Sequence, residues 1–285
     1  MAISTRSLSP GFGLEISGID FSTPFCESIA EELRQAWVDA HGLLLIRNQV
    51  LTPEQHIAIG AALGTVYSEG AKNNTALANY YLPGYPQIFR VSNKRKDGVA
   101  QGREDAGTYW HSDGSWQQNP PRGSLLYALE LPSVGGDTVF ADMHQAYEAL
   151  SPAMQKLFDG LEAQHSLAAA VMRTSYAKEY QGRLDEALAK TAVHPVVKPH
   201  PVSGKKALFV NPGFTGRILG VSQRESDALL SLLFEHCVAN ERTYRHTWQL
   251  HDLLIWDNFS NLHYAVANYK SHGDRYMHRV TVRLP

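Results

Sequence analysis

Cysteine is scarce in this chain, which has 285 residues and only two cysteines, Cys26 and Cys237. The two lie far apart and match no C-x-x-C pattern, so no disulfide framework is predicted. A single bridge between them stays open as an alternative. We predict free thiols in a reducing environment and therefore a cytoplasmic protein.

Long apolar runs and a surplus of one charge are also missing. No window approaches 18 consecutive apolar residues, and the N-terminal M-A-I-S-T-R-S-L-S-P lacks the apolar core of a signal peptide. The chain carries 26 Lys and Arg against 28 Asp and Glu, a formal net charge of −2. That balance provides no general attraction to nucleic acid or to an anionic membrane, and neither is expected as a partner.

Repeats and low-complexity tracts are absent, and most apolar segments are short. Turn signals separate them, such as P-S-V-G-G-D at 132–137 and N-P-G at 211–213. Many short strands with few helices predict a mainly β protein with peripheral helices around a double-sheet or barrel core. At this length, one domain over residues 1–285 is expected. The predicted strands are Leu43–Arg47, Gln87–Val91, Ser124–Leu131, Thr138–Ala141, Ala207–Val210, Leu253–Trp256 and Tyr276–Leu284.

Three helices are predicted from apolar spacing and capping residues. One covers about 26–40, where apolar residues recur every four positions. T-P-E-Q at Thr52–Gln55 is a capping box with proline in the first turn, and it predicts a helix to about Leu63. A second capping box opens a helix from Ser222 to about Val238. Its predicted core stripe consists of Leu229, Leu230, Leu232 and Leu233.

Two segments fit neither pattern. Residues 68–86 are rich in Gly, Asn and Tyr, and residues 167–190 are polar and partly helical in character. Long irregular connections in a compact domain often cover a binding site. We predict that both are lids, with mobile surface loops as the alternative.

Histidine is abundant, with 13 in the chain, and one lies in T-Y-W-H-S-D-G-S-W at 108–116. On an extended strand, His111 and Asp113 would point to the same side. The pair alone is weak evidence for a metal site, because chance alone would give about 0.5 His-x-Asp pairs in a chain of this composition. A second pair, His272 and Asp274, lies in a Ser-His-Gly-Asp turn and is interpreted as a loop.

Non-heme Fe(II) is commonly held by two histidines and one carboxylate, with the other positions open. A second histidine, His263, follows an apolar segment in D-L-L-I-W-D-N-F-S-N-L-H-Y-A. Asp257 and Asn258 are expected to cap the turn that orients His263. Zinc would also suit such ligands. The other histidines are expected to be structural or surface residues: His41, His56, His144, His165, His194, His200, His236, His246, His251 and His278.

The final predicted strand contains R-Y-M-H-R-V-T-V-R, in which Arg275, Arg279 and Arg283 share one face. Arginines among apolar residues would be costly to bury without anions. Arg275 and Arg279 are about 13 Å apart along a strand, too far to grip one carboxylate, so they indicate two anions. The alternative is an exposed edge strand with solvated arginines.

The motifs W-H-S-D, G-G-D-T at 135–138, W-D-N at 256–258, L-H-Y-A at 262–265 and R-Y-M-H-R at 275–279 follow one another along the chain. Together they resemble the Fe(II)/2-oxoglutarate dioxygenases of the taurine and 2,4-dichlorophenoxyacetate dioxygenase family. This resemblance implies a double-stranded β-helix, the jelly-roll or cupin-like core. It also implies His111, Asp113 and His263 as catalytic iron ligands. Thr138 and Arg275 would bind 2-oxoglutarate, and Arg279 would bind an anionic group of the substrate.

The implied reaction uses Fe(II), 2-oxoglutarate and O₂ to hydroxylate a small anionic organic acid, with C–O or C–S cleavage as a further outcome. The substrate is expected to be apolar or aromatic, because the candidate lining residues are Tyr109, Trp116 and Phe214, with Tyr80 and Tyr81. Taurine itself is disfavoured, since an Asn before the metal motif and a paired histidine near 68–75 are not matched here. A taurine, alkylsulfonate or alkyl sulfate dioxygenase stays as an alternative. A zinc hydrolase or isomerase is the alternative of another class, and a non-catalytic sensor is the third. We further expect a homo-oligomer.

Overall fold

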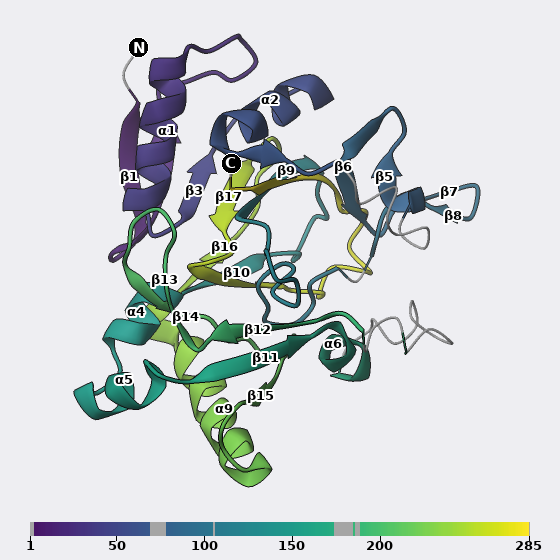
Figure 1. Cartoon of the computed structure of the whole chain (residues 1–285). Coiled ribbons are helices and arrows are strands. Elements are labelled where there is room, and N and C mark those ends of the chain that lie inside the picture. Colours follow the sequence, from purple (N-terminus) through teal and green to yellow (C-terminus); the bar gives the residue numbers. More distant parts are fainter. Residues whose placement is uncertain (1–2, 69–77, 105, 174–184, 186–188, 285) are drawn as a thin grey trace.

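A computed structural model describes residues 3–68, 78–104, 106–173, 185 and 189–284 (Figure 1). The protein is mostly sheet with fewer helices, as the sequence predicts. The largest sheet has the strand order β1-β2-β3-β17-β9-β19-β6-β5, and β4 pairs with β19 off this path. β2 and β3 are parallel, and the other pairs are antiparallel. The bounds are β1 Ser4–Ser9, β2 Phe12–Ser17, β3 Leu43–Ile46, β4 Thr65–Val66, β5 Tyr81–Leu82, β6 Tyr85–Ser92, β9 Gly123–Glu130, β17 Leu253–Asp257 and β19 Tyr276–Arg283.

Smaller sheets complete the β structure, and all their pairs are antiparallel. One has the order β16-β10-β18, another β12-β11-β15, and two are hairpins, β13-β14 and β7-β8. The bounds are β7 Arg95–Lys96, β8 Val99–Ala100, β10 Thr138–Asp142, β11 Glu162–Ser166, β12 Thr191–Pro195, β13 Val197–Pro199, β14 Lys206–Leu208, β15 Thr215–Ile218, β16 Thr243–His246 and β18 Asn261–Ala265.

The three predicted helices are confirmed, and two of them begin where the capping residues indicate. Thr52 and Gln55 form a reciprocal capping box at α2, and Ser222 and Glu225 form one at α9. One detail is wrong, because Leu232 is 44% exposed and only Leu230 and Leu233 of the predicted stripe are buried. The bounds are α1 Glu27–Asp39, α2 Pro53–Leu63, α4 Met143–Glu148, α5 Pro152–Phe158, α6 Leu167–Arg173, α9 Gln223–Cys237, η1 Ala78–Tyr80 and η2 Asn240–Arg242.

Side chains alternate between the two faces of the large sheet and fill two cores. Val280 and Val282 of β19 enter the outer core, which packs against α1 and α2. Met277 enters the inner core, with Leu126 of β9 and Trp256 of β17. β3 and β17 are buried along their whole length, which explains their continuous apolar sequences. The inner face of β9 and β19 therefore looks toward the smaller sheets.

Two local predictions concern the segment around His111 and the two predicted lids. The segment around His111 is not a strand: His111 makes an isolated bridge with His263, and a turn begins at Asp113. The interior of each predicted lid, residues 69–77 and 174–184 with 186–188, lies outside the described residues. The described ends of these segments form η1, β5, part of β6 and α6. Among the helices described, none combines the length and apolarity needed to span a membrane.

Candidate metal centre

Three side chains predicted as metal ligands come together between the sheets. The possible ligand atoms of His111, Asp113 and His263 all lie within 4.8 Å of one another. Nε2 of His111 is 3.7 Å from Oδ1 of Asp113, and Nε2 of His263 is 4.0 Å from Oδ2. In the described part of the chain, no other group of three or more His, Cys, Asp or Glu has this arrangement.

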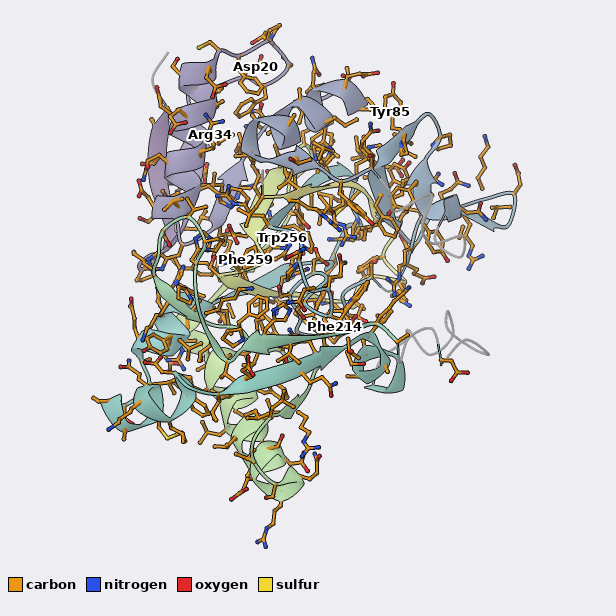
Figure 2. All side chains as sticks on the ribbon, in the orientation of Figure 1. Asp20, Arg34, Tyr85, Phe214, Trp256 and Phe259 are labelled. Carbon is orange, nitrogen blue, oxygen red and sulfur yellow. The ribbon has the colours of Figure 1, made fainter. Side chains whose placement is uncertain are left out.

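Backbone pairing brings the two histidines together across a long stretch of sequence. The backbone nitrogen of His111 donates to the carbonyl of His263 at 3.1 Å, and the reverse bond is 2.8 Å. β18 places His263 opposite Phe140 of β10. The imidazole rings of the two histidines are consequently 4.1 Å apart at their centroids. Figure 2 locates Trp256, whose ring lies 4.7 Å from that of His263.

The donor set fits a divalent metal. The Tyr109 carbonyl can only accept, so the 2.8 Å contact with Nδ1 of His111 makes Nδ1 the donor. That tautomer leaves the Nε2 lone pair of His111 free on the side of Asp113. Two imidazole nitrogens and one carboxylate suit Fe(II) and, by ligand type alone, also Zn²⁺.

Asp113 is held by residues from three other elements. Ser124 Oγ donates to Oδ2 of Asp113 at 2.8 Å, and the backbone nitrogen of Asp113 donates to Oδ1 of Asn258 at 3.2 Å. Arg279 Nη1 lies 3.3 and 3.4 Å from the two carboxylate oxygens. Burial opposes ionisation of this carboxyl, but Arg279 and the two histidines outweigh burial and hold its pKa well below the usual range.

Burial shifts the pKa of the His263 imidazole downward, whereas it shifts that of a carboxyl upward. Desolvation, followed by the neighbouring His111, lowers the pKa of His263 well below its usual value. A deprotonated carboxylate and a neutral imidazole are the forms that bind a metal. The site is therefore prepared electrostatically for a cation at neutral pH.

The predicted 2-oxoglutarate residues, Arg275 and Thr138, both contact Trp248. Trp248 Nε1 donates to Thr138 Oγ1 at 3.0 Å, and the Arg275 guanidinium lies 5.8 Å from the Trp248 ring. Arg275 is 2% exposed, and its Nε has no hydrogen-bond partner. Within the described residues, no carboxylate lies within 4.0 Å of its guanidinium. Burial lowers the pKa of Arg275, and Tyr269 and the Asp137 carboxylate offset this effect only in part, which marks the cost of a buried charge without a close anion.

Aromatic side chains stand around the metal-ligand cluster. The ring of Tyr109 is 4.8 Å from that of His111, and the ring of Phe214, labelled in Figure 2, is 6.1 Å away. Trp116 packs in the same cluster as Phe214. Tyr81 instead packs on Phe89, whose ring also faces Arg279 at 5.1 Å. The predicted aromatic residues thus divide into one group that contacts His111 and another that packs on Phe89 near Arg279.

Other predictions about this region can be compared with the contacts. Asp257 does cap its turn, since Oδ1 accepts from the nitrogen of Phe259 at 2.9 Å. Asn258 bonds to Asp113 instead of His263. The ten histidines expected to be structural or surface residues each contact a hydrogen-bonding atom outside the metal cluster. His272 and Asp274 lie in a loop, as predicted.

Two residues of the site were not foreseen. Ser124 is a hydroxyl in an otherwise apolar strand, and that mismatch is a signal that could have indicated an inward polar role. Trp248 carries no local signal, because its partner Thr138 lies on β10, more than a hundred residues earlier in the chain.

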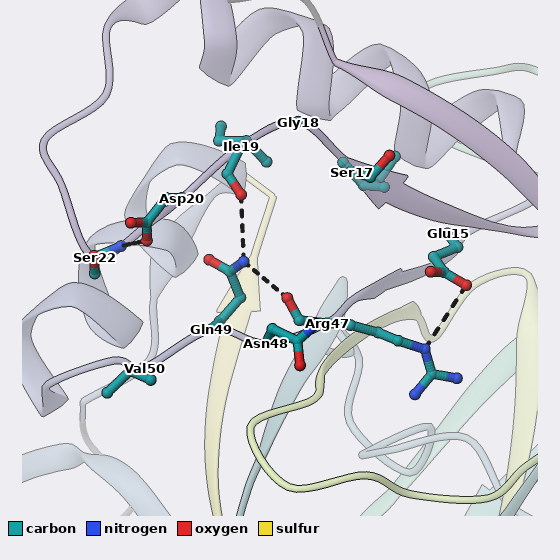
Figure 3. Close-up of a pocket in the computed structure, with 11 residues that line it drawn as sticks. Glu15, Ser17, Gly18, Ile19, Asp20, Ser22, Arg47, Asn48, Gln49 and Val50 are labelled. Carbon is teal, nitrogen blue, oxygen red and sulfur yellow. Dashed lines mark hydrogen bonds and ion pairs between the residues drawn. The ribbon is translucent and has the colours of Figure 1, made fainter.

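A separate depression lies between residues 15–22 and 47–50 (Figure 3). Gln49 Nε2 spans it, donating to the carbonyls of Ile19 and Arg47 at 3.3 and 3.0 Å. Glu15 lies 3.8 Å from Arg47. None of the predicted site residues lines this depression.

Comparison with known proteins shows the family to which the chain belongs. The family model described as "Taurine catabolism dioxygenase TauD, TfdA family" matches residues 4–281. The chain is 32% identical over 273 residues to the alpha-ketoglutarate-dependent 2,4-dichlorophenoxyacetate dioxygenase of Cupriavidus pinatubonensis, and 92% of each chain is covered. It is 31% identical over 289 residues to an alkylsulfatase of Acinetobacter baylyi, with 99% of this chain and 84% of the relative covered.

A solved structure extends this likeness to three dimensions. The crystal structure of AAD-2 in complex with Mn(II) and N-oxalylglycine has a TM-score of 0.86 and 30% identity, covering 100% of this chain and 99% of that chain. The protein therefore belongs to the TauD/TfdA family and is an alpha-ketoglutarate (2-oxoglutarate)-dependent dioxygenase.

Proposed function

We propose that this enzyme uses Fe(II), 2-oxoglutarate and O₂ to hydroxylate a small organic acid with an apolar or aromatic body. His111, Asp113 and His263 would hold the iron, and Thr138 and Arg275 would bind the distal carboxylate of 2-oxoglutarate. Arg279 would bind the anionic group of the prime substrate. The zinc hydrolase and sensor alternatives are set aside, because the chain belongs to a family of dioxygenases.

The observation that carries the proposal is the buried Arg275, which has no carboxylate within 4.0 Å among the described residues. A guanidinium that is 2% exposed needs an anion to offset its desolvation. Its position beside Trp248 and Thr138 offers that anion a forked cation and a neighbouring hydroxyl. A small dicarboxylate supplies such an anion and leaves its other end for the metal.

When bound, the iron supplies O₂ activation, in which 2-oxoglutarate is decarboxylated to succinate and CO₂ and a C–H bond of the acid is hydroxylated. The chain's own residues position the reactants. Ser124 and Asn258 orient the Asp113 carboxylate, and the Tyr109 carbonyl orients His111. Tyr109 and Phe214 would exclude water and hold the apolar part of the substrate.

The substrate class is supported by these aromatic residues and by relatives. One relative is named for 2,4-dichlorophenoxyacetate, an aryloxy acid, and another is named an alkylsulfatase. Hydroxylation of a carbon that bears a heteroatom would cleave the C–O or C–S bond. We favour an aryloxy or alkyl carboxylic acid, with a sulfonate, such as taurine, or a sulfate ester as the second candidate.

We make three further proposals, which concern the core fold, the domain organisation, and the compartment and assembly of the protein. We propose that the inner strands of the large sheet and the β16-β10-β18 sheet together form a double-stranded β-helix, supported by their inward-facing ligands. We propose one catalytic domain over residues 1–285, supported by a family match that spans 4–281. From the sequence, we propose that the protein is cytoplasmic and forms a homo-oligomer.

The test is anaerobic titration of the protein with Fe(II) and 2-oxoglutarate, followed by succinate assays in air. A weak visible charge-transfer band should appear, and anionic apolar acids should stimulate succinate release and O₂ uptake more than taurine does. His111→Ala, Asp113→Ala and His263→Ala should abolish release, whereas the control His236→Ala, on α9, should retain it. Release by the His263→Ala protein, or stimulation by uncharged compounds alone, would contradict the proposal.

A further inference from the structure

The inner face of β19 carries a third arginine that the proposed reaction does not use. Arg283 Nη2 donates to Gln117 Oε1 at 3.1 Å, and its guanidinium lies 4.7 Å from the ring of Tyr67. Its Nε is buried and has no hydrogen-bond partner. No carboxylate of the described residues lies within 4.0 Å of this guanidinium, so Arg283 resembles Arg275 in its lack of an anion.

Arg283 belongs to the same region as the metal centre. It follows Arg279 by four residues on one strand, a separation of about 13 Å between the Cα atoms. Tyr81 lies between these two regions, since it interacts electrostatically with Arg279 and with Tyr67, whose ring faces Arg283. Gln117 follows Trp116 in the segment that begins with the turn at Asp113. A molecule bound at Arg279 could therefore extend along β19 toward Arg283.

The charges of this region do not balance for a substrate with one anion. Two positive charges remain when the Asp113 carboxylate is set against the guanidinium groups of Arg275, Arg279 and Arg283. A divalent metal and dianionic 2-oxoglutarate cancel each other and do not change that surplus. A substrate with one carboxylate would leave the partly exposed Arg283 guanidinium, whose Nε is buried, without an anion among the described residues.

We propose that Arg283, Tyr67 and Gln117 form a second anion-binding subsite, and that the prime substrate is a dianion with oxyanion groups at both ends. The inference rests on the proposed function and narrows its substrate class. The Tyr67 ring and the Gln117 side chain fix the plane of the guanidinium. Its remaining N–H groups, Nε included, can then donate to a carboxylate or sulfate as a fork.

Matched pairs of acids test this subsite, because the members of a pair differ chiefly in the second carboxylate. Phenoxyacetate is compared with 4-carboxyphenoxyacetate, and heptanoate with octanedioate. Half-saturation for succinate release is measured in the Fe(II)- and 2-oxoglutarate-loaded enzyme. Dissociation constants for the same acids are measured by calorimetry on the metal-free protein, as a readout that does not depend on turnover.

The parent enzyme should prefer the diacid of at least one pair about 10- to 100-fold, the usual size of one charge-assisted contact. Arg283→Gln should bring that preference close to one in both measurements, and Arg283→Lys should restore part of it. Arg95→Gln removes an exposed arginine whose side chain donates to the Gly98 carbonyl, and it should keep the parent preference.

Two different failures can be told apart. If acids stimulate succinate release but the parent does not prefer diacids, or if Arg283→Gln weakens monoacid and diacid equally, the subsite is wrong and Arg283 only packs on Tyr67. If no acid stimulates 2-oxoglutarate-dependent release in any variant, the proposed function fails, and the subsite fails with it.

Discussion

Oδ1 of Asn258 accepts a hydrogen bond from the backbone nitrogen of Asp113 at 3.2 Å. The same oxygen accepts one from Nε1 of Trp256 at 3.1 Å, and the Trp256 ring packs on His263. One buried amide in the turn after β17 thus joins the segment that carries Asp113 to the strand region that carries His263. Asn258 is therefore a positioning residue for two of the three proposed ligands.

Asn258→Ala should weaken Fe(II) binding by about 10- to 100-fold, as loss of groups that orient metal ligands commonly does. It should also cost about 1–3 kcal/mol of unfolding free energy, because two buried donors lose their acceptor. Anaerobic Fe(II) titration and urea denaturation measure the two effects. Gln49→Ala is the matched control: it removes another buried amide, shown in Figure 3. It should lower stability without lowering metal affinity, and equal metal affinity in both variants would contradict the positioning role.

Arg275→Met should separate stability from co-substrate binding. Without 2-oxoglutarate the substitution should be neutral or stabilising, by about 0–3 kcal/mol, because it removes a buried charge that has no carboxylate within 4.0 Å among the described residues. The 2-oxoglutarate requirement should rise by about two to four orders of magnitude. Thermal unfolding with and without 2-oxoglutarate, together with succinate assays, measures both.

Arg122→Met provides the contrast for Arg275, since Arg122 is equally buried but lies 3.4 Å from Asp257. Its loss leaves a buried carboxylate without that partner and should destabilise by about 3–5 kcal/mol. The 2-oxoglutarate requirement should stay near the parent value. If Arg275→Met is the more destabilising of the two in the absence of ligand, Arg275 has a structural role that the contacts do not explain.

Arg279→Gln should chiefly impair the response to the prime substrate, raising half-saturation about tenfold or more. A smaller decrease in metal affinity is also expected, because Arg279 contacts the Asp113 carboxylate. Parallel titrations of Fe(II), 2-oxoglutarate and acid separate these effects. A change in the 2-oxoglutarate requirement alone would reverse the roles assigned to Arg275 and Arg279.

The buried His56 predicts how stability depends on pH. Burial, together with His278, lowers the pKa of His56 to about 3. Between the ordinary value of 6.5 and that value, the unfolded chain binds a proton that the folded chain does not. The stabilising contribution is therefore complete above about pH 6.5 and declines as the pH falls, by about 1.4 kcal/mol per pH unit for one such group.

His56→Leu should remove the contribution of one such group to the slope of unfolding free energy against pH. His165, with a pKa lowered to about 3 by burial, and His278, with one lowered to about 4, should keep part of the slope. Urea denaturation of both proteins at several pH values between 7.5 and 4.5 measures the difference. An identical slope in the two proteins would show that His56 is not neutral when folded.

Local features of the fold were predictable because they depend on bonds between near neighbours. The capping boxes of α2 and α9 each join residues three positions apart, so the sequence alone locates both helix starts. The apolar stripe of α9 was predicted too broadly. Which leucines are buried depends on the elements packed against the helix, and Leu232 faces away from them.

The proposed metal ligands could be named from the order of motifs, but their strand assignment could not. His111 and Asp113 were expected on one extended strand, and the structure instead has a single bridge to His263 followed by a turn. The two side chains still approach one cluster, because the turn at Asp113 is held by Asn258 and Ser124. Different backbone geometry thus produced the predicted grouping.

The sequence by itself determined the helix ends, the succession of short strands, the three proposed ligands and the row of arginines, because each is encoded by local spacing or by side-chain type. Only the tertiary structure decided what these groups contact. Pairing of β19 with β9 sets Arg279 opposite Leu126 and Thr281 opposite Ser124, and so brings Arg279 and Ser124 to the same carboxylate. Sheet register arises from contacts between distant segments, and no local pattern specifies which of them will meet. For the same reason, only the assembled sheets could leave Arg275 buried with no carboxylate of the described residues within 4.0 Å.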